Sequence, residues 1–325
     1  MIKKILDKRE VVLFIVLCIL FTGFSMNTEY FLDLDSLLSY SRYWVAPGML
    51  AIPMTFIIAT AGIDLSVGSI VAMCGIILGV LYRDYQWPIA GACAAAVLSG
   101  TAAGAVNGSV SSLLRIPPLV VTLATMTLFR GVAFGISKAD AISNFPPAFK
   151  YLGHGDLFSF NLNGNPVFVP SALGALLVTV VIGAFILRKT WIGRYTLALG
   201  ENPVAALYAA IPVHWLTFGI YTACGFVGGV ASLFYTSVYG TARADAAMGL
   251  ELEAIAAVVI GGTRISGGQA SVLGTLLGLL IIGILKYGLD LSGVRSQYVV
   301  IIVGVLLIVT AVFNEWMARR AGESK

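Results

Sequence analysis

Apolar stretches long enough to cross a lipid bilayer follow one another along almost the whole chain of 325 residues. A spanning helix needs about 20 mostly apolar residues. The stretches are continuous rather than alternating, which favours helices over a β-barrel. The sequence therefore predicts an all-α polytopic transmembrane bundle, in which residues 1–325 form a single transmembrane domain. Its expected spanning segments, about ten in number, are residues 10–26, 44–62, 64–82, 88–110, 119–137, 168–188, 214–239, 250–265, 270–288 and 297–316.

Composition excludes several other classes of protein. The chain is 58% hydrophobic and 11% charged, whereas a soluble domain carries about 25% charged residues. No run of Lys and Arg could follow a phosphate backbone, so we expect no nucleic-acid partner. The four cysteines lie in apolar runs without CxxC spacing, and two histidines cannot build a His-based zinc site. We therefore expect membrane lipid around the bundle, but no disulfide framework and no metal site.

The distribution of Lys and Arg between the segments predicts the orientation. With the N-terminus inside and ten crossings, twelve of the twenty fall on the inner side and seven on the outer side. Positive residues favour the cytoplasmic side, so both termini are predicted to be cytoplasmic. The first segment lacks a cleavage site and is interpreted as an uncleaved helix. Residues 138–167 then form an extracytoplasmic loop, and residues 189–213 a cytoplasmic loop.

Glycines recur at four-residue spacing within four segments. This spacing lets helix backbones approach closely in lipid, so it predicts a compact bundle. The glycines concerned are Gly75 and Gly79, Gly100, Gly104 and Gly108, Gly225 and Gly229, and Gly274 and Gly278. Two segments are interrupted. Residues 62–64 separate the second segment from the third, so that one of them is broken or re-entrant, and two glycines break the short eighth segment.

The cytoplasmic loop contains signals for a short helix. Asn202 is a good N-cap, Pro203 suits the first helical position, and Pro212 stops the helix. The expected helix, residues 203–210, is too short to span a membrane and marginal alone in water. It must pack on lipid headgroups, on the bundle itself or on a cytosolic partner. The chain has no GxxxxGK[ST] phosphate loop, so any ATPase lies on another chain.

Several motifs, in order, resemble those of the ribose-type importer permeases of the ATP-binding-cassette (ABC) class. Residues 62–69 resemble the GGIDLSVGS signature of that family, and residues 200–206 its GxNxxAA pattern. Residues 107–108, 115–123 and 261–278 match further features, so that the resemblance covers roughly residues 44–310. It is greatest to the autoinducer-2 and rhamnose branch. The chain departs from the family at Ala61, Ala210 and Ala270, where relatives often have glycine.

The resemblance implies a permease subunit of the bacterial plasma (inner) membrane that imports a monosaccharide or sugar-like molecule, with rhamnose or an autoinducer-2-like compound favoured. Its implied partners are an ATP-binding cassette ATPase, a periplasmic or lipid-tethered sugar-binding protein, and a second permease chain in a homo- or heterodimer. ATP and Mg would bind the ATPase, so no cofactor and no catalytic residue is expected here. The implied ATPase-coupling helix comprises Gly200, Glu201, Asn202, Pro203, Ala205, Ala206, Leu207 and Ile211.

Candidate substrate-pathway residues are the polar or unusual side chains within the segments: Asp64, Ser66, Asn107, Thr122, Met126 and Arg130. Asp64 has two interpretations, as the N-cap of the third segment or as a gate. Arg130 either contacts substrate hydroxyls or donates to carbonyls of a neighbouring helix, because a charge at this depth must face the bundle or a wet cavity. Thr122, Met126 and Arg130 share one helical face. Asn107 is interpreted first as a helix–helix contact.

Candidate docking residues for the binding protein lie on the outer side. They are Phe145, Phe149, Tyr151, Glu251 and Glu253. The aromatic residues alternatively cap the bundle, and the two glutamates alternatively favour the N-terminus of the eighth segment.

Two other classes of function remain as alternatives. An ion-coupled secondary transporter of small polar solutes normally needs buried Asp, Glu or His, and here the acidic residues cluster at ends and loops, with Asp64 the exception. An intramembrane protease needs a buried serine with a buried histidine, and His214 has no such partner run. Both fit the sequence less well than an importer permease.

Overall fold

The computed structural model describes residues 9–162 and 164–320. Within them, every one of the ten apolar segments contains a helix. The long helices are α2 (Arg9–Asn27), α4 (Arg42–Ala59), α5 (Val67–Arg83), α6 (Ile89–Leu113), α7 (Pro118–Ser137), α9 (Ser171–Lys189), α12 (Val213–Tyr239), α14 (Val272–Leu291) and α15 (Ser296–Arg320). The shorter elements are α3 (Leu34–Tyr40), α8 (Pro147–His154), β1 (Asp156–Leu162), β2 (Asn165–Pro170), α10 (Trp191–Glu201), α11 (Pro203–Tyr208) and α13 (Leu250–Ile260).

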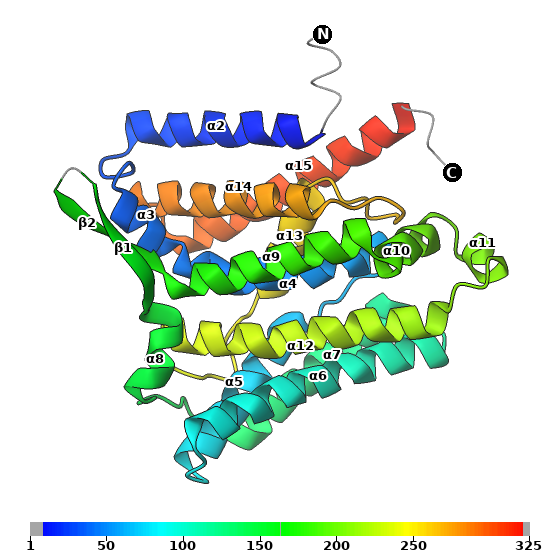
Figure 1. The fold of residues 1–325 in the computed structure, drawn as a ribbon, viewed down its shortest axis with the longest axis horizontal. Helices are drawn as coiled ribbons and strands as arrows, with labels where there is room; N and C mark the ends of the chain where they lie inside the picture. The colour runs from blue at the N-terminus through cyan, green and yellow to red at the C-terminus, as the bar shows by residue number, and fades with distance from the viewer. Residues whose placement is uncertain (1–8, 163, 321–325) are drawn as a thin grey trace.

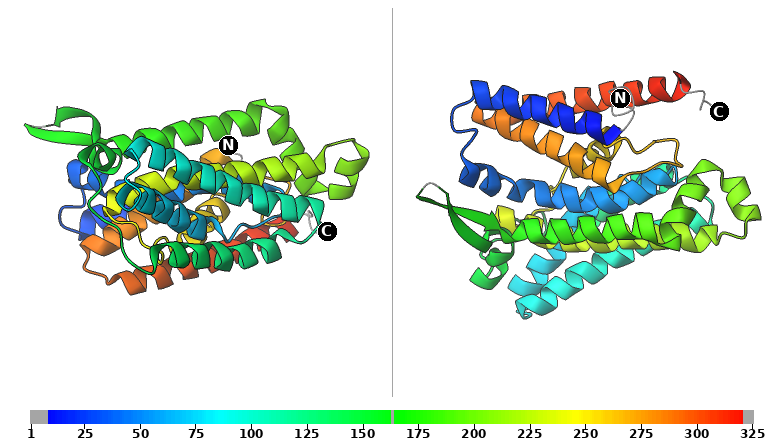
Figure 2. Two further views of the ribbon diagram at one scale, coloured as in Figure 1. Left: turned by 90° about the horizontal axis from the view of Figure 1, so that it is seen from below. Right: turned by 45° about the horizontal axis from the view of Figure 1, so that its top comes forward.

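The helices form a bundle with two distinct ends. In Figure 1, α2, α14 and α15 lie on one flank, α6 and α7 lie on the other, and α4, α9 and α12 run between them. The β1–β2 hairpin and α8 lie at one end of the bundle, and α10 and α11 lie at the opposite end, as Figure 2 also shows. Helix α2 begins and α15 ends at the α11 end. The described part of the chain thus begins and ends on one side of the bundle.

Length and apolarity make seven of the described helices able to cross a membrane. Helix α5 has 17 residues and α13 only 11. At 1.5 Å per residue, α13 extends about 16 Å, which is about half of the hydrocarbon core. The predicted eighth segment is therefore a helix that ends inside the bundle. The predicted break between the second and third segments is confirmed, because residues 62–66 are not helical.

Close glycine contacts hold α6 against α12. A Cβ atom on Gly104 would lie 2.8 Å from Gly225 Cα, and one on Gly100 would lie 2.9 Å from Gly229 Cα. Since no side chain fits there, the two backbones touch along the GxxxG face. Gly274 and Gly278 pack in the same way against the end of α13. The compact bundle predicted from the glycine spacing is confirmed.

The outer loop contains structure that the sequence did not reveal. Strands β1 and β2 pair antiparallel, with Phe158 opposite Val169 and Phe160 opposite Val167. An ion pair of 3.0 Å between Arg42 and Asp156 attaches the hairpin to the start of α4. Alternation of apolar and polar residues is weak in this segment, because few hairpin side chains are buried. The usual period-2 signal of a strand is therefore missing.

Candidate functional site

Helix α11 begins as the sequence predicts but ends two residues earlier than residue 210. The Asn202 Oδ1 atom accepts hydrogen bonds from the N–H groups of Val204 and Ala205, both at 3.0 Å. Asn202 is thus the N-cap, and Pro203 occupies the first helical position. The helix ends at Tyr208 because Ala210 adopts a positive φ of 58°, which a right-handed helix does not allow.

Large side chains of α11 are exposed to solvent. Tyr208 is 87% exposed, and Val204 and Leu207 are 63% and 62% exposed. Only Ala206, with Ile211 after the helix, packs into the main core. The predicted coupling segment is completed by the exposed residues Glu201, Asn202, Pro203 and Ala205 and by Gly200, which is buried. A six-residue helix cannot be stable alone, so its apolar face needs a partner surface.

A tight backbone contact connects α10, which leads into α11, with the end of α4. The N–H of Gly268 donates to the Ala59 carbonyl at 3.0 Å. Gly200 lies against both of these groups, and a Cβ on it would meet the Ala59 carbonyl and would lie 2.5 Å from Gly268 N. Because Ala59 is the last residue of α4, this contact adjoins the non-helical residues 62–66.

Residues 62–66 carry a buried polar network. The Ser66 N–H and hydroxyl both donate to Asp64 Oδ1, at 2.8 and 2.7 Å. Asn107 of α6 donates to the Ser66 hydroxyl at 2.7 Å, and Thr122 of α7 donates to the Ile63 carbonyl at 3.1 Å. Four of the six candidate pathway residues therefore meet here. Asp64, Ser66, Asn107 and Thr122 are all fully buried in the interior of the bundle.

The N-cap interpretation of Asp64 is wrong. Ser66 occupies the N-cap position of α5 and makes no side-chain cap hydrogen bond. Asp64 instead bonds the N–H two residues ahead, which forms an Asx turn and fixes the non-helical backbone. Sequence reasoning also missed Tyr221 of α12, whose hydroxyl oxygen would lie 2.7 Å from a Cβ on Gly62. A tyrosine inside an apolar segment gives no sequence signal that its hydroxyl lies beside a polar network.

Three buried polar atoms around this network have no hydrogen-bond partner within the described residues. They are Asp64 Oδ2, Asn107 Oδ1 and the Tyr221 hydroxyl oxygen. A buried polar atom without a partner costs about 1–3 kcal/mol. The hydrogen-bonding capacity of the network around residues 62–66 is thus not fully used within the described residues. A rearrangement of this segment that pairs these atoms would recover part of that energy.

Arg130 does not join this network. Its Nη1 atom donates to the carbonyls of Ala244 and Ala246, at 2.7 and 2.6 Å. These carbonyls belong to the loop between α12 and α13, not to a helix. Arg130 therefore donates to backbone carbonyls, as one of its two interpretations predicts, but the acceptors lie in a loop. In the same loop, Arg243 hydrogen-bonds Asp245 and so lowers the pKa of that carboxyl. Met126, which shares a face with Arg130, is half-buried and lies apart from the polar network.

The predicted docking residues have separate environments. Phe145 and Phe149 are buried, and their tilted rings pack together with centroids 5.0 Å apart. This packing fits the alternative interpretation, in which the aromatic residues cap the bundle, and their role in docking stays a prediction. Tyr151 is 60% exposed. Glu251 and Glu253 lie in the first turn of α13, where carboxylates favour the helix N-terminus.

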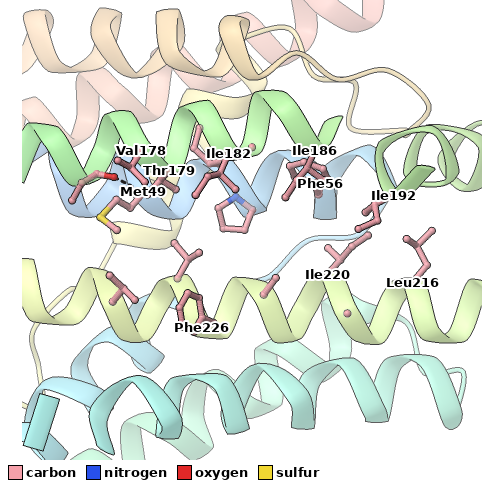
Figure 3. A pocket seen from close by; sticks show the side chains of 18 of the residues that line it. Met49, Phe56, Val178, Thr179, Ile182, Ile186, Ile192, Leu216, Ile220 and Phe226 are labelled. Atoms are coloured by element: carbon pink, nitrogen blue, oxygen red, sulfur yellow. Dashed lines mark hydrogen bonds between the residues drawn. The ribbon is translucent and has the colours of Figure 1, made fainter. Parts of the chain in front are cut away.

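A cavity of ≈ 730 Å³ lies between α9 and α12 over α4. Figure 3 shows Ile182 of α9, Ile220 and Phe226 of α12, and Met49 and Phe56 of α4 directed at this space. Almost all of its lining side chains are apolar. A sugar-like molecule would lose hydrogen bonds to water there without gaining others. The cavity therefore suits hydrocarbon, and we do not place a polar substrate in it.

These features define a polytopic membrane transport protein: a bundle of spanning helices, an exposed short helix at one end and a buried polar segment within. Residues 36–311 match the family described as branched-chain amino acid transport system / permease component. The chain belongs to this permease family. It is similar to the proteins named "Autoinducer 2 import system permease protein LsrD" of Escherichia coli (strain K12) and of Shigella flexneri, each 34% identical over 328 residues and covering 96% of both chains.

No solved structure matches the chain significantly. The family and the relatives show that the chain is a transport subunit of an ABC importer, not an enzyme, and a multi-pass protein of the inner membrane. They confirm the resemblance seen in the sequence and give no support to the ion-coupled alternative. Membership of this family implies an ATPase and a substrate-binding protein as partners in general.

Proposed function

We propose that this chain is the permease subunit of an importer for autoinducer 2 or a closely similar sugar-like molecule, and that α11 is its ATPase-coupling helix. The observation that carries the proposal is the position of α11. Its apolar face is exposed, and the segment leading to it touches the end of α4. The names of the relatives support the substrate class.

The end of the bundle that carries α11 would be cytoplasmic. Helix α2 begins and α15 ends there, which agrees with the distribution of Lys and Arg and with cytoplasmic termini. The hairpin and α8 would then face the binding protein outside. In this orientation Tyr151 remains a candidate docking residue, because it is exposed beside the hairpin.

The contacts provide a mechanical route for coupling. Closure of the ATPase would push α11 and, through Gly200, the Ala59 carbonyl at the end of α4. Residues 62–66 follow directly, so the hydrogen bonds among Asp64, Ser66 and Asn107 would rearrange. Transport would then proceed by alternating access. ATP and Mg would bind to the ATPase and not to this chain.

A second permease chain would complete the membrane part of the importer. In a single bundle the candidate gate residues are fully buried. A substrate path that opens beside them would therefore need a second protein surface to enclose it. A second copy of this chain or a homologous permease would supply that surface. The mass spectrum of the purified complex would distinguish a homodimer from a heterodimer.

The test is affinity purification of the chain from its native membrane in mild detergent, followed by mass spectrometry. We expect a phosphate-loop ATPase to co-purify. Replacement of residues 202–211 by a Gly/Ser stretch should remove the ATPase and leave the permease folded. As a control, a Gly/Ser replacement of residues 84–86, in the loop between α5 and α6, should leave the ATPase bound. A folded wild-type chain that repeatedly purifies without any ATPase would contradict the proposal.

A further inference from the structure

Four tyrosine rings form a continuous row at the hairpin end of α4 and α12. The ring centroids of Tyr40 and Tyr43 lie 5.5 Å apart, and those of Tyr43 and Tyr239 lie 5.7 Å apart. Tyr239 then contacts Tyr235 at 4.4 Å. We refer to these four residues as the tyrosine row. It connects α3 and α4 with α12, which is distant from them in sequence.

The row remains accessible. Tyr43 is 48% exposed and Tyr239 is 51% exposed, while Tyr40 and Tyr235 are half-buried. The Tyr235 hydroxyl accepts a hydrogen bond from the Ala247 N–H at 3.1 Å. The exposed rings therefore lie in the middle of the row, and its Tyr235 end contacts the loop between α12 and α13. This is the same loop whose carbonyls Arg130 holds.

A charged pair lies beside the row. Lys286 Nζ and Glu253 Oε1 are 2.8 Å apart, and their side chains are 29% and 28% exposed. Lys286 is followed on α14 by Tyr287, whose ring centroid lies 5.1 Å from that of Tyr40, so the pair adjoins one end of the row. A charged pair on spanning elements is expected to face water or the bundle interior, not lipid. Partial exposure of both side chains therefore indicates contact with water.

The short length of α13 explains how water reaches this depth. Helix α13 begins only at Leu250 and extends about 16 Å, so α4, α12 and α14 extend beyond its N-terminus toward the hairpin end. Leu252, beside Glu253, is 53% exposed. The tyrosine row and the Glu253–Lys286 pair thus border the same accessible region above α13.

We propose that the tyrosine row and the Glu253–Lys286 pair form a binding site for a small polyol, through which substrate approaches the loop held by Arg130. Tyrosine rings offer rigid apolar faces for the C–H surface of a polyol, and their hydroxyls add polar contacts. The carboxylate and the ammonium group can accept from and donate to polyol hydroxyls. Tyrosines that only anchor a protein at the membrane interface would not need a charged pair among them. The inference rests on the proposed function for its substrate class.

The first experiment measures binding directly on the full chain in detergent. A Leu252→Cys reporter is introduced with Cys18→Ser, which removes the exposed native thiol. Its labelling by a polar maleimide is timed with and without autoinducer 2, ribose and rhamnose. We expect at least one of these probes to slow labelling by about tenfold at ten times its dissociation constant. A Leu114→Cys reporter should be unaffected, because Leu114 is 65% exposed and directly follows α6.

Two further variants test the composition of the site. In the Leu252→Cys background, Tyr43→Ala should abolish protection and Tyr43→Phe should retain most of it, because the ring is kept. The neutral double variant Glu253→Gln/Lys286→Met should also lose protection. Labelling that none of the three probes slows, or protection that survives both Tyr43→Ala and the neutral double variant, would overturn the proposal and assign the row to membrane anchoring.

Uptake separates this inference from the proposed function. In the complete importer, Tyr43→Ala and Tyr239→Ala should lower uptake of the protecting probe by about tenfold, with the ATPase still bound. Tyr85→Ala, an exposed tyrosine outside the row, should transport as wild type. Normal uptake by both row variants would reject the site even where the ATPase binds. Loss of the ATPase from the wild-type chain would instead reject the proposed function, and the labelling result would stand by itself.

Discussion

Gly200, the next-to-last residue of α10, lies against the carbonyl of Ala59, the last residue of α4, with no room for a side chain between them. Gly268 hydrogen-bonds the same carbonyl. Three segments distant in sequence therefore meet at one backbone group. On one side of it lies α11, and on the other side lie residues 62–66 with their buried polar network.

Replacement of Gly200 by alanine should destabilise this junction. The new Cβ would overlap the Ala59 carbonyl, so backbone must move, at a cost of about 1–3 kcal/mol. Thermal unfolding of the purified chain, followed by tryptophan fluorescence, measures the effect. Gly219→Ala in α12 is the control, because no atom lies within 4 Å of a Cβ there. Equal unfolding temperatures for the two variants would refute the tight contact.

Two alanines that stand where relatives often have glycine occupy strained backbone. Ala61 and Ala210 have φ values of 61° and 58°, in the left-handed region that costs an L-residue roughly 1–2 kcal/mol. Ala61→Gly and Ala210→Gly should therefore each raise stability by about 1 kcal/mol. Ala205→Gly, within α11, should lower it. If both glycine variants unfold earlier than wild type, the positive φ values are not those of the folded chain.

The hydrogen bond from Asn107 to Ser66 should contribute to the closed gate. Asn107→Leu removes the donor and should cost about 1–3 kcal/mol, since the Asp64 network loses a partner while buried. Ser66→Ala should cost a similar amount. In a double-mutant cycle the combined variant should cost less than the two single changes together, because they act on one network. Strict additivity would show that the two residues do not interact.

Arg130 should order the loop between α12 and α13. Arg130→Met leaves the carbonyls of Ala244 and Ala246 without their donor, and charged hydrogen bonds of this kind contribute about 1.5–3 kcal/mol. Hydrogen exchange of the loop amides should accelerate by about tenfold or more. Arg243→Met removes only an exposed pair with Asp245 and should have little effect. A loop equally protected in both variants would exclude this role.

The sequence predicts the helices of this fold well, because spanning helices need long apolar runs and nothing else in the chain resembles them. The glycine spacing predicts close helix contacts such as the one between α6 and α12, because two backbones can touch only where side chains are absent. The α11 cap is predictable because Asn202 and Pro203 act on their immediate neighbours. These signals are all local or periodic.

Contacts between distant segments could not be predicted in this way. Nothing in the local sequence places Gly200 on Ala59, or aims Arg130 at the carbonyls of residues 244 and 246. The N-cap interpretation of Asp64, one of two, was wrong because N-cap and Asx-turn residues share the same chemistry, and only the helix start at Val67 distinguishes them. The hairpin was missed because its exposed strands lack alternation. Tyr221 was missed because its apolar surroundings concealed its hydroxyl.

The central claim is that the exposed face of α11 contacts an ATPase. A photo-reactive amino acid at Tyr208, the most exposed large side chain of α11, tests it in the native membrane. Illumination should join the chain to a phosphate-loop ATPase, and the same group at Tyr85 in the loop between α5 and α6 should not. Cross-links from position 208 to lipid or to the chain itself alone, in a preparation where the ATPase is present, would contradict the account.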